Sequence, residues 1–292
     1  MKTIRSPLAM TAWSHRMRRE GIVIGLVPTM GALHGGHVEL LRRARAETDH
    51  VVMSLFVNPT QFNEASDLAA YPRTEEADAA IARDAGVDVI FAPPADEVYP
   101  DGFTTTVQVA GPALGLEGDA RGRVHFEGVA TVVLKLLNMV GPDVAYFGQK
   151  DGQQLAVIRR MVRDLDVPVR IEAVDTVREP DGLALSSRNV RLRGEDRERA
   201  LALHAALRAA GDTVAGGTRD ARTVVAAARA AMSPYAVDPE YLAVVDADTF
   251  TELGEIDRRA LITVAARVGD VRLIDNHPLI PNGSVSPCPL SP

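Results

Sequence analysis

Apolar runs and helical apolar patterns alternate through the first half of the chain. Ile22–Val27 is a short apolar run that ends at Pro28, which is typical of a buried strand. Gly36–Thr48 instead carries apolar residues at the spacing of an amphipathic helix. The same reasoning predicts further strands at Val51–Val57, Val87–Phe91, Thr104–Val109, Val144–Phe147 and Val169–Val174, and further helices at Glu75–Ala85, Phe126–Val140 and Asp151–Asp164.

The pattern changes at the polar stretch Arg178–Arg193, which separates two predicted domains. Beyond it we predict helices at Glu195–Ala210 and Arg219–Met232, and strands at Tyr241–Val245, Leu261–Ala266 and Arg272–Ile274. Residues 1–177 should form an α/β domain with a Rossmann-like parallel sheet and helices on both faces. Residues 178–276 should form a smaller C-terminal α+β lid domain. Residues 277–292 are rich in Pro and Ser, which predicts a disordered tail.

Composition narrows the class of protein. The formal net charge is -7, which argues against a dedicated nucleic-acid binder, because such proteins carry a basic face. The single cysteine, Cys288, excludes a disulfide within the chain and suits a reducing compartment. No long apolar run is present, so we expect no signal peptide and no membrane span. The predicted location is the cytoplasm.

A glycine-rich segment with two histidines follows the first predicted strand. It reads Pro28-Thr29-Met30-Gly31-Ala32-Leu33-His34-Gly35-Gly36-His37. Its glycines allow a sharp turn and a close approach of the backbone to a ligand. The helix that follows offers N–H groups and a positive dipole end to a phosphate. His34 and His37 share one face of its first turn and can donate hydrogen bonds to developing phosphate charge.

Two further polar segments suit phosphate chemistry, although each alone fits an ordinary turn or a solvated linker equally well. Phe147-Gly148-Gln149-Lys150-Asp151 again follows a strand and begins a helix, and its lysine supplies a compact positive charge. Leu185-Ser186-Ser187-Arg188-Asn189 lies between the predicted domains, where two hydroxyls and a guanidinium could close over a triphosphate. Gln61 and Gln154 offer amide groups for a small hydroxy acid, although solvated surface side chains would look the same.

These segments together identify a family resemblance. The His-x-Gly-His pattern resembles the nucleotidyltransferase superfamily, which includes class I tRNA synthetases. The longer string from Pro28 to His37 resembles the pantothenate synthetase (pantoate–β-alanine ligase) family, and the similarity extends from about Ile22 to Asn276. The strings Phe-Gly-x-Lys-Asp and Ser-Ser-Arg resemble the same family. Leu185 departs from it, because methionine is common at that position.

The resemblance implies specific roles for the residues of these segments. It implies that His37, His34 and Lys150 are catalytic. It implies that Gln61 and Gln154 bind the substrates pantoate and β-alanine. It implies an ATP site formed by Met30, Gly31, Ala32, Leu33, His34, Gly35, Gly36, His37, Gly148, Gln149, Lys150, Asp151, Val177, Leu185, Ser186, Ser187 and Arg188.

The reaction implied is the ATP-dependent condensation of pantoate with β-alanine through a pantoyl adenylate, with release of AMP and pyrophosphate. It belongs to the synthesis of pantothenate and coenzyme A. Magnesium should be held mainly by the triphosphate, so its protein ligands stay open, with Asp78 as a conceivable indirect one. The family also implies a homodimer that binds no nucleic acid and no membrane.

Three alternatives remain. A nucleotidyltransferase with a phosphate-bearing acceptor would need an additional basic cluster, which Gln61 and Gln154 do not supply. A tRNA synthetase disagrees with the acidic composition. A nucleotide-binding regulator without catalysis would be expected to lack His37, Lys150 or Ser186, and all three are present.

Overall fold

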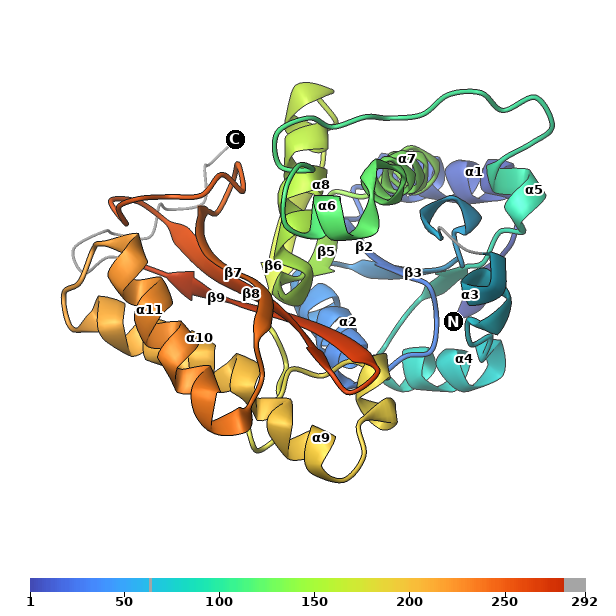
Figure 1. Cartoon of the computed structure of the whole chain (residues 1–292). Coiled ribbons are helices and arrows are strands. Elements are labelled where there is room, and N and C mark those ends of the chain that lie inside the picture. The colour runs from blue at the N-terminus through green and yellow to red at the C-terminus, as the bar shows by residue number, and fades with distance from the viewer. Residues whose placement is uncertain (63–64, 281–292) are drawn as a thin grey trace. The chain divides into compact units, whose positions relative to one another are not determined.

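The computed structural model describes residues 1–62 and 65–280, and the chain forms two compact units (Figure 1). The first unit comprises residues 1–149, 153–177 and 185–187, and the second comprises residues 150–152, 178–184 and the chain from residue 188 onward. The chain therefore passes between the units near Lys150 and again on either side of Leu185.

Six parallel strands form the sheet of the first unit, in the order β1-β4-β3-β2-β5-β6. The strands are β1 (Lys2–Ile4), β2 (Ile24–Thr29), β3 (His50–Leu55), β4 (Val89–Phe91), β5 (Val144–Gly148) and β6 (Arg170–Val174). In this order β2 lies between β3 and β5. The residues that follow these three strands therefore meet at one edge of the sheet, where open α/β sheets bind ligands.

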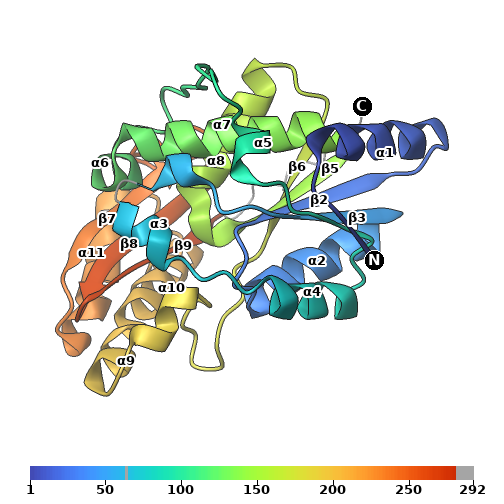
Figure 2. The same ribbon diagram turned by 90° about the vertical axis from the view of Figure 1, so that its right-hand side faces the viewer.

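Helices cover both faces of this sheet. They are α1 (Pro7–Arg19), α2 (Gly35–Glu47), α3 (Ala65–Ala70), α4 (Glu75–Asp84), α5 (Ala95–Val98), α6 (Glu117–Arg121), α7 (Arg123–Val140) and α8 (Gly152–Asp164), with the 3-10 turns η1 (Pro59–Gln61) and η2 (Gln149–Asp151). Helices α1, α7 and α8 lie on one face, whereas α2 and α4 lie on the other (Figure 2).

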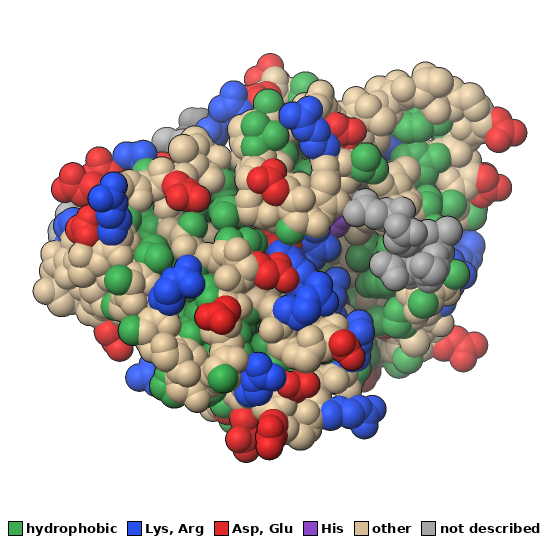
Figure 3. Space-filling model, in the orientation of Figure 1, with side chains coloured by type: hydrophobic (Ala, Val, Ile, Leu, Met, Phe, Trp, Pro, Cys, Tyr) green, Lys and Arg blue, Asp and Glu red, His purple; other side chains and the backbone are tan. Residues whose placement is uncertain are grey.

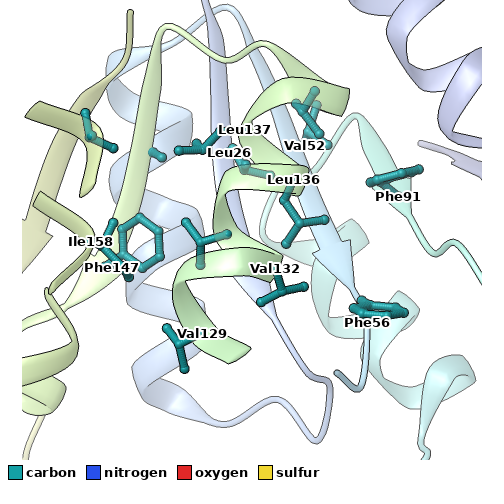
Figure 4. Packing of buried hydrophobic residues seen from close by; sticks show 14 of the residues in the cluster. Leu26, Val52, Phe56, Phe91, Val129, Val132, Leu136, Leu137, Phe147 and Ile158 are labelled. Carbon is teal, nitrogen blue, oxygen red and sulfur yellow. The ribbon is translucent and has the colours of Figure 1, made fainter. Parts of the chain in front are cut away.

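Alternate side chains of each central strand enter different cores. Leu26 of β2 belongs to the cluster that contains Leu136 and Leu137 of α7 (Figure 4). Its neighbour Val27 belongs to the opposite cluster, with Leu41 of α2. A strand that is buried on both faces requires a continuous apolar run, which explains the pattern seen in the sequence.

The second unit has an antiparallel sheet with helices. Its strands are β7 (Pro239–Asp246), β8 (Ala260–Val268) and β9 (Val271–Leu279), in that order. Its helical segments are α9 (Glu195–Arg199), α10 (Leu201–Ala215), α11 (Ala221–Met232), η3 (Ser187–Arg191, which begins in the first unit) and η4 (Ser233–Tyr235). Leu203 of α10 and Val224 of α11 share one core with Ile262 of β8. The predicted α/β fold with a smaller C-terminal unit is confirmed.

Two predictions from the pattern are wrong. Thr104–Val109 is not a strand, although it is rich in β-branched residues. Val107 donates its backbone N–H to Thr131 Oγ1 of α7 at 2.9 Å, so a helix side chain, not a neighbouring strand, satisfies this group. The predicted tail also begins too early, because 277–279 complete β9, where they pair with β8. The rest of that tail, from residue 281 and including Cys288, lies outside the described residues.

Among the elements that the pattern did not indicate are the short helices α3, α5 and α6, and also β1 and α1. Strand β1 has only three residues, and it exists because Lys2, Thr3 and Ile4 pair with β4. Helix α1 begins with Pro7 in its first turn, a favourable position for proline, and it buries Met10 and Trp13 against the sheet. Both elements depend on partners that are distant in the sequence.

Candidate active site

A tight turn joins β2 to α2 and contains the glycine-histidine segment. Gly31 has φ +86°, and Ala32 after it also has a positive φ of 52°. A Cβ at Gly31 would lie 2.9 Å from Asp78 Oδ2 and 2.9 Å from Leu55 Cδ1, which is too close for either contact. Glycine is therefore required at position 31 by both its conformation and its surroundings.

Asp78 of α4 holds this turn in place. Its side chain is buried, and Oδ2 accepts from Ala32 N at 3.0 Å while Oδ1 accepts from Leu33 N at 2.8 Å. Thr74 Oγ1 donates to the same Oδ2 at 3.0 Å. Both carboxylate oxygens thus bind within the protein. Asp78, which we considered as an indirect metal ligand, anchors the turn that carries the two histidines.

The two histidines cap the start of α2 with the same ring atom. His34 Nδ1 accepts from Gly36 N at 3.2 Å, and His37 Nδ1 accepts from His34 N at 3.3 Å. The ring centroids are 4.2 Å apart. A nitrogen that accepts a backbone N–H carries no proton, so each neutral ring has its proton on Nε2. The turn thereby prepares two Nε2–H donors at a helix N-terminus, where an anion is favoured.

The loop after β6 returns to this turn within the first unit. Leu185 N donates to Val177 O at 2.9 Å, which closes the loop that leads to Ser186. A Cβ at Gly35 would lie 3.0 Å from Leu185 Cδ1. Leu185 therefore lies against the beginning of α2, although the two segments are far apart in the sequence. Ser186 and Ser187 belong to the first unit, whereas Arg188 belongs to the second.

The two glutamines that we expected at the substrate site also lie in the first unit. Gln61 ends η1 after β3, and its Nε2 donates to Met30 Sδ at 2.9 Å. Gln154 lies in the first turn of α8 and is partly exposed. Its neighbour Gln153 is buried and donates to three backbone carbonyls between 112 and 115. Gln153 is therefore structural, which leaves Gln154 as the glutamine of this pair that could contact a substrate.

The segment after β5 contains a cation, Lys150, which belongs to the second unit. Gly148 ends the strand, and a Cβ there would meet nothing within 4 Å, so this glycine leaves space for a ligand. Gln149 is buried. Lys150 Nζ lies 3.8 Å from Asp151 Oδ1, and the Lys150 backbone carbonyl accepts from Asn276 Nδ2 at 2.8 Å.

Sequence reasoning missed the supporting role of two residues, Asp78 and Asn276. Neither Asp78 nor Asn276 stands in a glycine-rich or histidine-containing string, and both are buried polar side chains that bind backbone groups of the predicted site. For Asp78, the only signal in the sequence was its position near the start of a predicted helix. Acidic residues are common there in any solvated helix, so this position does not indicate a role.

The described residues offer neither a metal cluster nor a membrane-spanning helix. Across residues 1–62 and 65–280, no cluster of three or more His, Cys, Asp or Glu side chains could hold a metal ion. In the same part of the chain, no helix has the length and apolar character needed to cross a membrane. Acidic and basic side chains are interspersed over the face shown in Figure 3.

Comparison with known proteins gives one consistent family. The family model described as pantoate-beta-alanine ligase matches residues 2–278. A pantothenate synthetase of Chelativorans sp. is 53% identical over 262 residues, which cover 90% of this chain and 92% of that protein. A pantothenate synthetase of Heliobacterium modesticaldum is 50% identical, with coverage of 94% and 98%.

Solved structures agree with this result. The crystal structure of pantothenate synthetase from Thermus thermophilus has a TM-score of 0.88 at 46% identity, covering 96% of this chain and 100% of that one. Pantoate-beta-alanine ligase from Francisella tularensis, complexed with beta-gamma ATP and beta-alanine, has a TM-score of 0.75 at 34% identity, covering 95% and 97%. This chain, with its histidine-capped turn after β2, belongs to the pantoate–β-alanine ligase family.

Proposed function

We propose that this chain condenses pantoate with β-alanine to give pantothenate, with ATP converted to AMP and pyrophosphate through a pantoyl adenylate. Membership of the ligase family supports the overall reaction. The observation that carries the proposal for the site is the pair of histidines, His34 and His37, whose Nδ1 atoms both accept backbone N–H groups at the start of α2.

In the first step, a carboxylate oxygen of pantoate attacks the α-phosphorus of ATP, and the bond to the pyrophosphate oxygen breaks. Negative charge shifts within the phosphate groups during this step. The Nε2–H groups of His34 and His37 would donate to these oxygens, and the N-terminus of α2 would add the field of its dipole. His37 would also be the group that gives a proton where one is needed. Holding the reactants in line supplies much of the remaining acceleration.

In the second step, the β-alanine nitrogen attacks the acyl carbon, the bond from that carbon to the AMP oxygen breaks, and the ammonium that forms loses a proton. The adenylate reacts readily with water, so it must be shielded between the steps. We assign this shielding to the second unit as a lid. The Francisella relative that is complexed with beta-gamma ATP and beta-alanine supports these two small molecules as substrates here.

Other residues would hold the triphosphate and the nucleoside. Lys150 would steady the α-phosphate, because a lysine ammonium is a compact charge suited to phosphate oxygens. Ser186, Ser187 and Arg188 would bind the β- and γ-phosphates and then release pyrophosphate. Val177 would contact the adenine, since its carbonyl already fixes the Leu185 backbone beside the glycine turn. The remaining residues proposed for the ATP site are Met30, Gly31, Ala32, Leu33, Gly35, Gly36, Gly148, Gln149, Asp151 and Leu185.

Gln61 and Gln154 would bind pantoate and β-alanine through their amide groups. The magnesium proposed here would neutralise charge on the triphosphate. Phosphate and water oxygens are its usual ligands, and the Asp78 carboxylate is already bound to Ala32 N and Leu33 N, so the protein fits an ion carried by the nucleotide. We further propose that the protein acts as a homodimer in the cytoplasm, which sedimentation and cell fractionation would check.

An omission assay tests the reaction. AMP release is measured with ATP, magnesium, pantoate and β-alanine, and each component is left out in turn. The proposal expects AMP in the complete mixture, pantothenate as the coupled product, and a pantoyl adenylate when β-alanine alone is omitted. ATP binding without AMP release would favour a regulator. AMP joined to a phosphate-bearing acceptor would favour a nucleotidyltransferase of another class.

A further inference from the structure

A buried asparagine connects Gln61 to the rest of the first unit. Asn58 follows β3, and 1% of its surface is exposed. Its Oδ1 accepts from Thr60 N at 3.3 Å, and its Nδ2 donates to Gly128 O of α7 at 3.1 Å. A backbone N–H can only donate and a backbone carbonyl can only accept. These two partners therefore fix which end of the Asn58 amide is oxygen and which is nitrogen.

The orientation of Asn58 determines the orientation of the Gln61 amide. Asn58 Nδ2 also donates to Gln61 Oε1 at 3.1 Å, so the oxygen of Gln61 must face Asn58. The nitrogen of Gln61 consequently faces the other way, and Nε2 donates to Met30 Sδ at 2.9 Å. A thioether is a weak acceptor. Gln61 therefore presents N–H donors on the side of the Met30 turn, where a carboxylate or hydroxyl oxygen would be a stronger acceptor.

Tyr99 reinforces this arrangement from the other side of Asn58. Tyr99 Oη lies 2.8 Å from Asn58 Oδ1, and because that oxygen can only accept, the phenol is the donor. The ring is held between Phe56 and Phe103, with centroid distances of 6.2 and 5.1 Å. Burial raises the pKa of Tyr99, which keeps the donating proton on the phenol.

Close packing of α7 keeps the network together. A Cβ at Gly128 would lie 2.6 Å from Thr60 O, so only glycine allows α7 to approach η1 this closely. On the same helix, His125 Nδ1 lies 3.1 Å from Gln61 O. The backbone of Gln61 and the amide of Asn58 are thus both held against α7. Because the backbone is fixed, the hydrogen bonds of the Gln61 amide determine the direction of its side chain.

We propose that Tyr99 is a positioning residue that acts on Gln61 through Asn58. It holds the Gln61 amide with its N–H donors toward the substrate. The site therefore favours an acid that has an oxygen acceptor opposite these donors. This inference rests on the proposed role of Gln61 in binding pantoate. Tyr99 itself touches no substrate in this scheme. Its hydroxyl acts on binding because it adds a further bond that holds the Asn58 amide in the orientation set by Thr60 N and Gly128 O.

The substitution Tyr99→Phe tests the proposal, because it removes the hydroxyl and keeps the ring. The KM for pantoate should rise about 3- to 10-fold, as expected for the loss of one buried hydrogen bond, while the KM for ATP stays unchanged. Tyr146→Phe is the matched control. Tyr146 is also a phenol with one donated bond, to Glu47 Oε2 at 3.1 Å; it is fully buried, whereas Tyr99 is half-buried, and it has no part in the network.

A positioning role predicts dependence on Gln61. In a Gln61→Ala background, Tyr99→Phe should change the KM for pantoate by less than about twofold, because residues that act through one another are not additive. An equal rise in both backgrounds, or a rise in the KM for ATP of the same size, would show a merely structural effect and overturn the proposal. Thermal melting of each variant confirms folding.

A second variant tests the same orientation without changing Tyr99. Gln61→Glu keeps an oxygen for Asn58 Nδ2 but presents an acceptor in place of the donor. It should raise the KM for pantoate more than Gln61→Ala does, and wild-type affinity in Gln61→Glu would contradict the inference. Failure of the proposed function looks different, because the unmodified protein would then show no pantoate-dependent AMP release at all.

Discussion

His34 and His37 are bound to each other through the backbone, because His37 Nδ1 accepts the N–H of His34 at 3.3 Å. His34 in turn accepts from Gly36 N at 3.2 Å. Each ring therefore has a structural atom, Nδ1, and a second nitrogen that carries the proton of the neutral ring. This division would let one side chain both cap a helix and take the proposed part in the reaction, and it predicts that the two roles can be separated by substitution.

The substitution His34→Asn should separate capping from chemistry. Asparagine is a favourable N-cap residue and replaces the acceptor at Nδ1, but it has no group at the place of Nε2. We expect His34→Asn to keep the thermal stability of the wild type and to lower the rate of pantoyl adenylate formation about 100-fold or more. Single-turnover formation of the adenylate and a thermal melt measure the two effects.

His34→Ala provides the matched comparison, because it removes both atoms. It should lose a similar amount of activity and, in addition, about 1 kcal/mol of stability from the missing cap. Equal melting temperatures for His34→Asn and His34→Ala would argue against a capping role for this ring.

The substitution His37→Ala should abolish adenylate formation while leaving the fold intact. The ring's bond to His34 N is weak, at 3.3 Å, whereas the donor at Nε2 is removed from the start of α2. The measurement is AMP release in the complete mixture, with circular dichroism as the check on folding. Full activity of this variant would contradict the assignment of His37 as a catalytic residue.

Asp78→Asn should weaken ATP binding by loosening the turn. The amide would direct an NH2 group at one of two backbone N–H groups, Ala32 N or Leu33 N, and would leave that group buried without an acceptor. We expect a stability loss of about 1–3 kcal/mol and a raised KM for ATP. Asp84→Asn is the control, because Asp84 is exposed on the same helix. If both variants bind ATP like the wild type, Asp78 does not hold the nucleotide turn.

Gly31→Ala should damage the same turn by a steric route. Gly31 and Gly102 both have a positive φ, +86° and +80°, so alanine costs about 1–2 kcal/mol of backbone strain at either position. A Cβ at Gly102 meets nothing within 4 Å, whereas at Gly31 it meets Asp78 and Leu55. Denaturant unfolding should show a larger loss for Gly31→Ala, and only this variant should lose ATP turnover. Equal losses in both variants would attribute the effect to φ alone.

The stability of the second unit should depend on pH through His204. Burial lowers the pKa of His204, and the positive charge of Arg178 lowers it further, with Asp275 acting in the opposite sense. The unfolded state therefore binds a proton more readily than the folded state. Stability should be fully present above the ordinary histidine pKa of about 6.5 and should fall as the pH drops below it.

Unfolding midpoints between about pH 7.5 and pH 5 test this dependence, because the histidine titrates in that range. The buried Nδ1 of His204 has no hydrogen-bond partner within the described part of the chain, so in a protonated ring its N–H would lack an acceptor there. His204→Gln should flatten the profile on the acidic side. An unchanged acidic slope in that variant would assign the effect to other groups.

The sequence by itself determined the local chemistry. Strand β2 is buried on both faces and therefore requires an unbroken apolar run, and the turn after it has glycine at position 31. The apolar run and the glycine could both be recognised in the sequence before the fold was known. The spacing of His34 and His37 predicted that they lie close together at the start of a helix, where His34 proves to be the N-cap of α2 and His37 lies in its first turn. The strings around Lys150 and Ser186 pointed to phosphate chemistry for the same reason, since the residue types carry the charge and the hydroxyls.

Only the tertiary structure determined the hydrogen bonds between residues that are distant in the sequence. Asp78 reaches Leu33 across 45 residues, and Tyr99 reaches Asn58 across 41, and no local pattern encodes either pair. The failure at 104–109 has the same origin, because β-branched residues form a strand only where another strand offers its backbone. The sequence therefore determined which chemical groups stand at the candidate site and how the two histidine rings are oriented, whereas long-range packing determined how the turn and the Gln61 amide are held.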